Sequence, residues 1–144
     1  MTRIAADTVI DERYQVLEHL GTGGMAEVYV AHDLQLERNV ALKLLHERFA
    51  RDEEFVERFR REASSAAGLQ HQHVVSVYDR GETEGVPYIA MEYVQGRTLK
   101  QLVRESGPLD PAQAIDLTIQ NVQGGQGGVV AAPIAKAVMQ ELLR

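Results

Sequence analysis

A glycine-rich stretch at residues 20–33, LGTGGMAEVYVAHD, constrains the fold of this 144-residue chain more than any other segment. Apolar and polar residues alternate on both sides of the glycines, over residues 14–20 and 27–32, and this alternation predicts two β-strands. A third run, NVALKLL at residues 39–45, predicts a third strand of an antiparallel series. Glycine reaches positive φ without steric cost, so the stretch is compatible with a simple hairpin turn or with a loop that surrounds phosphate groups.

The pattern changes to that of a helix at residues 52–70. Apolar residues recur at helical spacing, acidic residues occupy the first turn, and Gly68 lies near the end. Two further strand-like runs follow at residues 73–82 and 86–94, separated by residues 83–85, and predict a second hairpin. The expected fold class is therefore α+β, with five antiparallel strands and one helix in the first two thirds of the chain.

The remaining third divides into shorter segments. Residues 98–106 and 110–120 have helical patterns, and in the second of these Asp110 is suited to cap the helix and Pro111 to occupy its first position. Residues 121–128 are rich in glycine, and residues 129–144 carry one apolar stripe. We therefore expect an N-terminal extension at 1–10, a lobe at 11–95, two helices at 96–120, a linker at 121–128 and a C-terminal helix at 129–144.

Composition narrows the classes of function. Fifteen Lys and Arg residues against 21 Asp and Glu residues give a formal charge of −6, which argues against nucleic acid or an anionic membrane as partner. The chain has no cysteine, which excludes disulfides and thiolate metal sites. The N-terminus lacks the apolar region of a signal peptide, and no segment is apolar enough to span a membrane. A cytoplasmic protein without a membrane segment is the expectation.

Two charged residues fall where apolar ones are expected. Lys43 alternates onto the same strand face as Ala41 and Leu45, and Glu62 shares a helix side with residues that should face the sheet. A buried charge is costly unless it is paired, so an ion pair between Lys43 and Glu62 is the economical arrangement. The alternative is that both long side chains extend to solvent.

A glycine loop beside a buried lysine suits a polyphosphate. At this point residues 11–120 resemble the N-terminal lobe of bacterial serine/threonine protein kinases of the eukaryotic type. Gly21, Gly23 and Val28 match the family pattern G-x-G-x-x-G-x-V, with Ala26 at the third glycine. VALK at 40–43 is similar to the family's lysine strand, FRREASSAAGLQH at 59–71 to its glutamate helix, and PYIAMEYVQGRTL at 87–99 to the segment that leads into the second lobe.

The resemblance implies a role for each matching residue. Lys43 would contact the α and β phosphates of ATP, and Glu62 would orient Lys43. The backbone of the turn would cover the phosphates: Gly21, Thr22, Gly23, Gly24, Met25 and Ala26. Leu20, Val28 and Ala41 would cover the adenine, Met91 would be the gatekeeper, and the backbone of Glu92 and Val94 would bond its edge.

His71 and His73 raise the question of a metal site. Two histidines without further ligands rarely suffice for one. The segment is similar instead to the family's H-P-x segment, with Gln72 in place of proline, so no metal site is expected.

Phosphoryl transfer in the family depends on an H-R-D aspartate and on the magnesium ligands, an asparagine and the D-F-G aspartate. None of these motifs occurs in the chain. The expectation is a kinase lobe truncated before the catalytic loop, without magnesium ligands of its own and unable to transfer phosphate alone.

Residues 127–144, GGVVAAPIAKAVMQELLR, are similar to the C-terminus of penicillin-binding transpeptidases, but that family's motifs S-x-x-K, S-x-N and K-T-G are absent. The favoured interpretation is simpler: a helix that covers apolar surface. The candidates for that surface are Leu99, Leu102, Ile115, Leu117 and Ile119.

Three functional hypotheses follow. The first is an ATP-binding lobe of a serine/threonine kinase. The second is a non-catalytic, pseudokinase-like module that dimerises through this lobe or docks on intact kinases. The third is a fragment without function. A thermal shift with Mg-ATP separates the first from the third.

Overall fold

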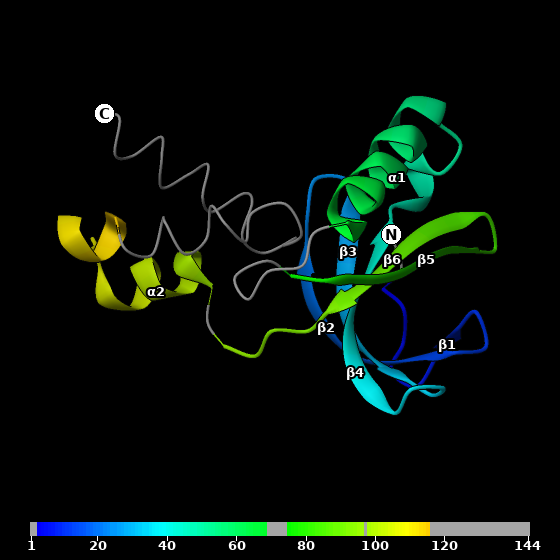
Figure 1. Cartoon of the computed structure of the whole chain (residues 1–144), viewed down its shortest axis with the longest axis horizontal. Helices are drawn as coiled ribbons and strands as arrows, with labels where there is room; N and C mark the ends of the chain where they lie inside the picture. The colour runs from blue at the N-terminus through cyan, green and yellow to red at the C-terminus, as the bar shows by residue number, and fades with distance from the viewer. Residues whose placement is uncertain (1–2, 69–74, 97, 116–144) are drawn as a thin grey trace.

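The computed structural model describes residues 3–68, 75–96 and 98–115 of the chain. Six antiparallel strands form one sheet in the order β1-β2-β3-β4-β6-β5, and helix α1 packs on it against β5 and β6 (Figure 1). The strands are β1 (Val9–Ile10), β2 (Tyr14–Thr22), β3 (Ala26–Asp33), β4 (Arg38–Leu45), β5 (Val77–Thr83) and β6 (Val86–Glu92). The α+β class is confirmed, and all five expected strands are present.

Strand β1 is the one that the sequence did not reveal, and it lies in the segment expected to be an extension. Ile10 pairs with Tyr14 and Val9 with Gln15. Between the strands, Asp11 and Glu12 adopt positive φ, at 52° and 55°. Positive φ is typical of glycine and rare in other residues. Because this turn uses Asp and Glu instead, the sequence lacks the glycine by which a hairpin turn is usually recognised.

The central strands β3 and β4 divide the core into two faces because successive side chains point to opposite sides of a sheet. We call the side covered by α1 the helix face; its buried residues are Ala26, Val28, Ala41, Leu45, Phe59, Ala63, Ile89 and Met91. We call the other side the outer face; its buried residues are Ile10, Tyr14, Val16, Tyr29, Ala31, Val40, Leu42, Leu44, Tyr88 and Ala90. Each β4 residue therefore belongs to one face according to its parity.

Helix α1 (Glu53–Ala67) begins one residue later than the predicted range, and residues 69–74 lie outside the described part. Asp52 accepts a hydrogen bond at Oδ1 from the Glu54 N–H, 3.0 Å away, and so satisfies one of the free amides at the helix start. Phe59 and Ala63, four residues apart, are buried against the sheet. The short 3-10 helix η1 (Glu47–Phe49) connects β4 toward α1.

The second hairpin, β5–β6, is shorter than predicted, since residues 75–76 precede β5 and residues 93–94 follow β6 without strand structure. Glu84 and Gly85 form its turn with φ of 49° and 78°, the positive values that tight hairpins favour. Within β5, Gly81 passes directly beneath the ring of Tyr88, where a Cβ would lie 2.6 Å from Cζ. Only glycine fits at this position.

Helix α2 (Leu99–Ser106) lies beyond the end of β6 (Figure 1). Thr98 and Gln101 form a reciprocal capping box at its start, and Gly107 follows its end at φ 75°. The next helix begins at Pro111 and Asp110 precedes it, as predicted, with the Ala114 N–H donating to Asp110 O; Ile115 is exposed. The rest of that helix, the glycine-rich linker, the C-terminal helix, Leu117 and Ile119 lie outside the described residues.

Candidate functional site

The predicted ion pair between strand and helix is confirmed. Lys43 Nζ on β4 lies 2.8 Å from Glu62 Oε1 on α1, and the two side chains are 8% and 34% exposed. The alternative in which Lys43 extends to solvent is thus wrong. The lysine reaches the helix face because it shares the parity of Ala41 and Leu45, and its ammonium also lies 5.8 Å from the Phe59 ring centroid.

The glycine turn joins β2 to β3 and is closed by a hydrogen bond from the Gly23 N–H to Ala26 O, 2.8 Å long. Gly21, Gly23 and Gly24 do not have positive φ, so backbone conformation is not what requires glycine here. A Cβ at Gly21 or Gly24 would meet nothing within 4 Å, and one at Gly23 would reach only Ala26 O, at 3.4 Å. The glycines therefore leave open space above the turn.

The same turn contains the backbone N–H groups of Gly24 and Met25. Neither donates a hydrogen bond to a residue that the structure describes, so both are available to a ligand. Backbone N–H groups gathered at a turn can bind an anion. Of the two interpretations open from the sequence, the geometry is compatible with the phosphate loop as well as with a hairpin turn.

Strand pairing places the turn close to Lys43. Ala26, which closes the turn, is opposite Leu45, and Val28 is opposite Lys43. Val28 and Ala41 lie together on the helix face with Met91, which pairs with Ala41 across β4 and β6. A cation and an apolar surface are thus brought to one side of the sheet, next to the end at which the glycine turn lies.

The remaining predicted site residues lie at the margins. Leu20 and Val94 are exposed, and Thr22 ends β2 with its hydroxyl donating to Glu27. The Glu92 N–H donates to Ser76 O, and its carboxylate accepts from the Ser76 N–H at 3.1 Å. Glu92 is thereby fixed at the end of β6. His71 and His73 lie outside the described residues.

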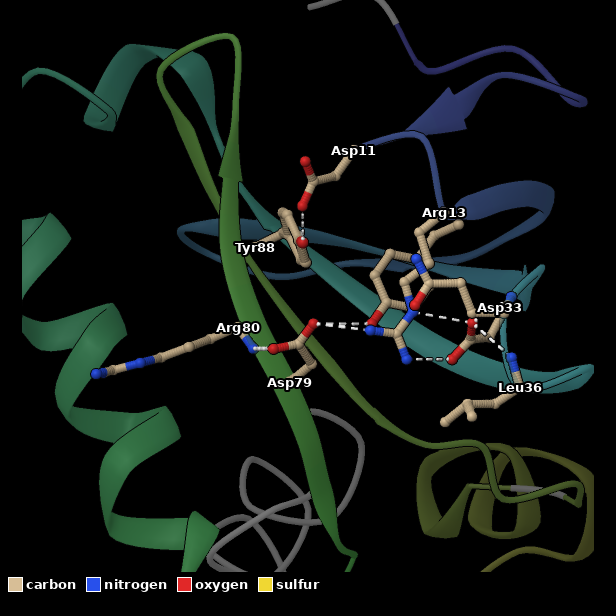
Figure 2. Close-up of polar contacts among 9 residues, drawn as sticks. Asp11, Arg13, Asp33, Leu36, Asp79, Arg80 and Tyr88 are labelled. Atoms are coloured by element: carbon tan, nitrogen blue, oxygen red, sulfur yellow. Dashed lines mark hydrogen bonds and ion pairs between the residues drawn. The ribbon is translucent and has the colours of Figure 1, made fainter.

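A polar network on the outer face was not predicted (Figure 2). Arg13 donates from Nε and Nη2 to the two carboxylate oxygens of Asp33, at 2.9 and 2.8 Å, and from Nη1 to Asp79 at 3.4 Å. Tyr14 also donates to Asp79, and Tyr88 donates to Asp11. In sequence these residues lie far apart, and only the turn between β1 and β2 together with strands β2, β3, β5 and β6 brings them into contact.

The network shifts the protonation of its members. The hydrogen bond from Arg13 outweighs burial and lowers the pKa of Asp33 to about 2. Burial, with the carboxylate of Asp79, raises the pKa of Tyr14, and burial with Asp11 raises the pKa of Tyr88. Asp33 is therefore charged and the phenols of Tyr14 and Tyr88 are neutral at pH 7, which fits a structural role.

Comparison with known proteins agrees with this architecture. The family model described as "Protein kinase domain" matches residues 14–125. The serine/threonine-protein kinase PrkC of Bacillus subtilis is 50% identical over 113 residues, 78% of this chain and 17% of that protein. PknB of Mycobacterium tuberculosis is 50% identical over 112 residues, 75% of this chain and 18% of that protein. The chain thus spans less than a fifth of these relatives' length.

Solved structures give the same result. The crystal structure of the Mycobacterium tuberculosis PknI kinase domain has a TM-score of 0.70 to this chain at 34% identity, covering 82% of this chain and 48% of that one. A structure described as the PpkA-294 apo form has a TM-score of 0.63 at 26% identity, covering 72% and 43%. No helix among the described residues is long and apolar enough to cross a membrane.

Proposed function

Since this chain belongs to the protein kinase domain family, whose members here are bacterial serine/threonine kinases, we propose that residues 11–95 form its ATP-binding lobe. In this proposal residues 96–120 begin the second lobe. The nucleotide lies on the helix face below the glycine turn. Family membership itself implies ATP as the substrate that the domain binds.

The observation that carries the proposal is the contact of Lys43 with Glu62. A buried ammonium held by a carboxylate from the helix is preorganised to meet the α and β phosphates of ATP. The turn above it offers the amides of Gly24 and Met25 and the space that the glycines leave. These residues fit a triphosphate.

The adenine is proposed to lie against Val28 and Ala41, which are apolar and belong to the same face as Lys43. Leu20 covers it from the start of the glycine turn, and Met91 limits the depth of the pocket. The backbone of Glu92 and Val94 bonds the edge of the base. Support for this placement comes from the pairing of Ala41 with Met91 across adjacent strands.

Magnesium is a different case. The family's magnesium ligands are the D-F-G aspartate and an asparagine of the catalytic loop, and neither motif occurs in this sequence. The described residues also contain no group of three or more acidic or histidine side chains suited to a metal. We therefore derive no step through magnesium. These 144 residues are proposed to bind nucleotide without transferring phosphate, because they supply no aspartate to accept the hydroxyl proton.

Calorimetric titration with ATP tests the proposal on the wild type, on Lys43→Met and on Lys100→Met. Lys100 is an exposed lysine on α2, so its variant controls for loss of one positive charge. We expect measurable binding in the wild type and the control and its loss in Lys43→Met. No binding in the wild type would refute the proposal, and transfer of labelled phosphate that depends on Lys43 would refute its non-catalytic part.

A second candidate function, docking on another kinase lobe, is favoured by the turn between β3 and β4. Leu34 and Leu36 are 46% and 56% exposed there. Asp33 Oδ1 accepts from the Gln35 and Leu36 N–H groups and so fixes the turn that presents them. The occupant proposed is a second copy of this chain. Sedimentation of the wild type beside a Leu34→Ser, Leu36→Ser variant tests it, and a monomeric wild type at high concentration would contradict it.

A further inference from the structure

His46 follows β4 directly and is 3% exposed, although it is polar and belongs to no predicted site. It lies on the outer face because its parity is that of Leu42 and Leu44. His46 lies next to the glycine turn that joins β2 to β3. A buried polar side chain needs hydrogen-bond partners, and those of His46 are in the turn.

Two hydrogen bonds join His46 to the glycine turn. Its backbone N–H donates to Met25 O at 2.8 Å, and its ring Nε2 lies 3.1 Å from Gly23 O. A carbonyl oxygen only accepts, so Nε2 must carry the proton. His46 therefore holds the carbonyls of two of the four residues at the tip of the turn.

The bond to Gly23 O also sets the direction of a neighbouring amide. The carbonyl of Gly23 and the N–H of Gly24 belong to one planar trans peptide, in which the two groups point in opposite directions. While His46 holds the carbonyl on its own side, the Gly24 N–H faces away from His46. It is one of the two amides of the turn that have no partner in the described residues, and a Cβ on Gly24 would meet nothing within 4 Å.

The second ring nitrogen of His46 faces a carboxylate. Nδ1 has no hydrogen-bond partner and lies 3.9 Å from Glu27 Oε1 on β3. Burial acts to raise the pKa of Glu27, but hydrogen bonds from His19 and Thr22, with the charges of His19 and His46, leave this pKa below its usual range. Glu27 is thus an anion at neutral pH. Its other oxygen already accepts from Thr22 at 2.8 Å and contacts His19.

We propose that His46 is a positioning residue that holds the glycine turn with the Gly24 N–H directed at the phosphates. The proposal rests on the nucleotide site described above. The hold consists of the hydrogen bond from Nε2 to Gly23 O and the bond from the His46 backbone N–H to Met25 O.

A second histidine contacts the same carboxylate. His19 on β2 contacts the Glu27 oxygen that also accepts from Thr22, whereas Nδ1 of His46 lies 3.9 Å from the other oxygen. From η1 the ring of Phe49 approaches His46, with its centroid 6.2 Å from the imidazole. Control variants must therefore separate His46 from His19.

The first arm of the test needs no nucleotide. Nitrogen chemical shifts of the imidazole give the tautomer of His46, and backbone relaxation gives the order parameter of Gly24. We expect proton occupancy at Nε2, and a Gly24 order parameter that is lower in His46→Ala than in the wild type. In His46→Gln, which can keep a donor toward Gly23 O, the order parameter should stay near the wild-type value. Proton occupancy at Nδ1 alone, or an unchanged Gly24 order parameter in His46→Ala, would overturn the proposal.

The second arm measures ATP affinity at pH 7.5 in the wild type, His46→Gln, His46→Ala and His19→Gln. We expect His46→Ala to weaken binding about 2- to 10-fold, the range that one hydrogen bond supplies, and His46→Gln to stay within about twofold of the wild type.

The affinity of His19→Gln tests which histidine is responsible, and it should stay within about twofold of the wild type. If His19→Gln weakens ATP binding and His46→Ala does not, the proposal for His46 is wrong. If the wild type binds no ATP, the proposed function fails, but the first arm still decides whether His46 orients the turn. His46→Gln also covers the case in which His46→Ala does not fold.

Discussion

Lys43 Nζ lies 2.8 Å from Glu62 Oε1, and the lysine side chain is nearly buried whereas the glutamate is a third exposed. This asymmetry makes the two partners unequal. Removing Glu62 leaves a buried ammonium without its anion, whereas removing Lys43 leaves a carboxylate that water can reach. The main effect of the pair is therefore to hold the Lys43 ammonium in place, and its contribution to stability is secondary.

We expect Glu62→Gln to lower the free energy of unfolding by about 1–2 kcal/mol, less than for a fully buried pair because Glu62 is partly exposed. The free energy of unfolding of Lys43→Met should stay within about 1 kcal/mol of the wild-type value, since an apolar side chain suits the helix face. Urea denaturation measures both. Glu57→Gln, in an exposed pair, is the control, and a larger loss for Lys43→Met than for Glu62→Gln would contradict the asymmetry.

The pairing of Asp33 with Arg13 predicts a loss of stability in acid. The pKa of Asp33 in the folded state is about 2, below the value of about 3.9 in an unfolded chain. The contribution of ionised Asp33 to the free energy of unfolding is therefore complete above about pH 4, and it is lost as the pH falls toward 2. The shift corresponds to about 2 kcal/mol.

Asp33→Asn checks this, because it removes the titrating group at a site only 1% exposed. Denaturant midpoints measured between pH 7 and 2 should show a lower stability for the variant at pH 7 and a smaller difference from the wild type near pH 2. A difference that stays constant with pH would show that Arg13 does not stabilise the charged form.

Gly81 passes beneath Tyr88, whose ring has no room to move. The ring packs edge-on against Tyr14 with centroids 5.7 Å apart, and its hydroxyl donates to Asp11. We expect Gly81→Ala to destabilise the protein by about 1–3 kcal/mol through overpacking. Thermal unfolding measures the loss, and Gly24→Ala, where a Cβ meets nothing, should stay within about 0.5 kcal/mol.

The open space above the glycine turn predicts a separation of binding from stability. A Gly24→Val substitution should fill the volume in which the phosphates are proposed to lie and should weaken ATP binding about tenfold or more. The fold should be retained, because no described atom lies within 4 Å of the added Cβ. Gly68→Val, at an equally open glycine after α1, is the control. Equal ATP affinity in both variants would place the phosphates elsewhere.

The ion pair of Lys43 and Glu62 was predictable because two local periods suffice to find it. The two-residue period of a strand places Lys43 with Ala41 and Leu45, and the helical period places Glu62 on the side of Phe59. Each residue is then a charge on a face that must be buried. Because a buried charge without a partner is energetically costly, their pairing can be inferred without knowledge of the strand register.

The contacts of Arg13 and His46 were not predictable in this way. Arg13 meets Asp33 and Asp79, which are 20 and 66 residues away, and His46 meets Gly23, 23 residues away. Strand β2 shifts its pairing register with β3 between Val16 and Glu18 and again between His19 and Gly21. Each shift changes which side chains meet, and no local pattern marks it.

From its amino-acid order alone, this chain specified five of its six strands, the helix that packs on them, the faces of Lys43 and Glu62 and the charge pair at the centre of the candidate site, because these follow from short periods and the cost of burying charge. The tertiary structure alone decided that Asp11 and Glu12 turn β1 back onto the sheet, and that His46 reaches the glycine turn. Those outcomes depend on register and on distant strands meeting, which no segment contains by itself.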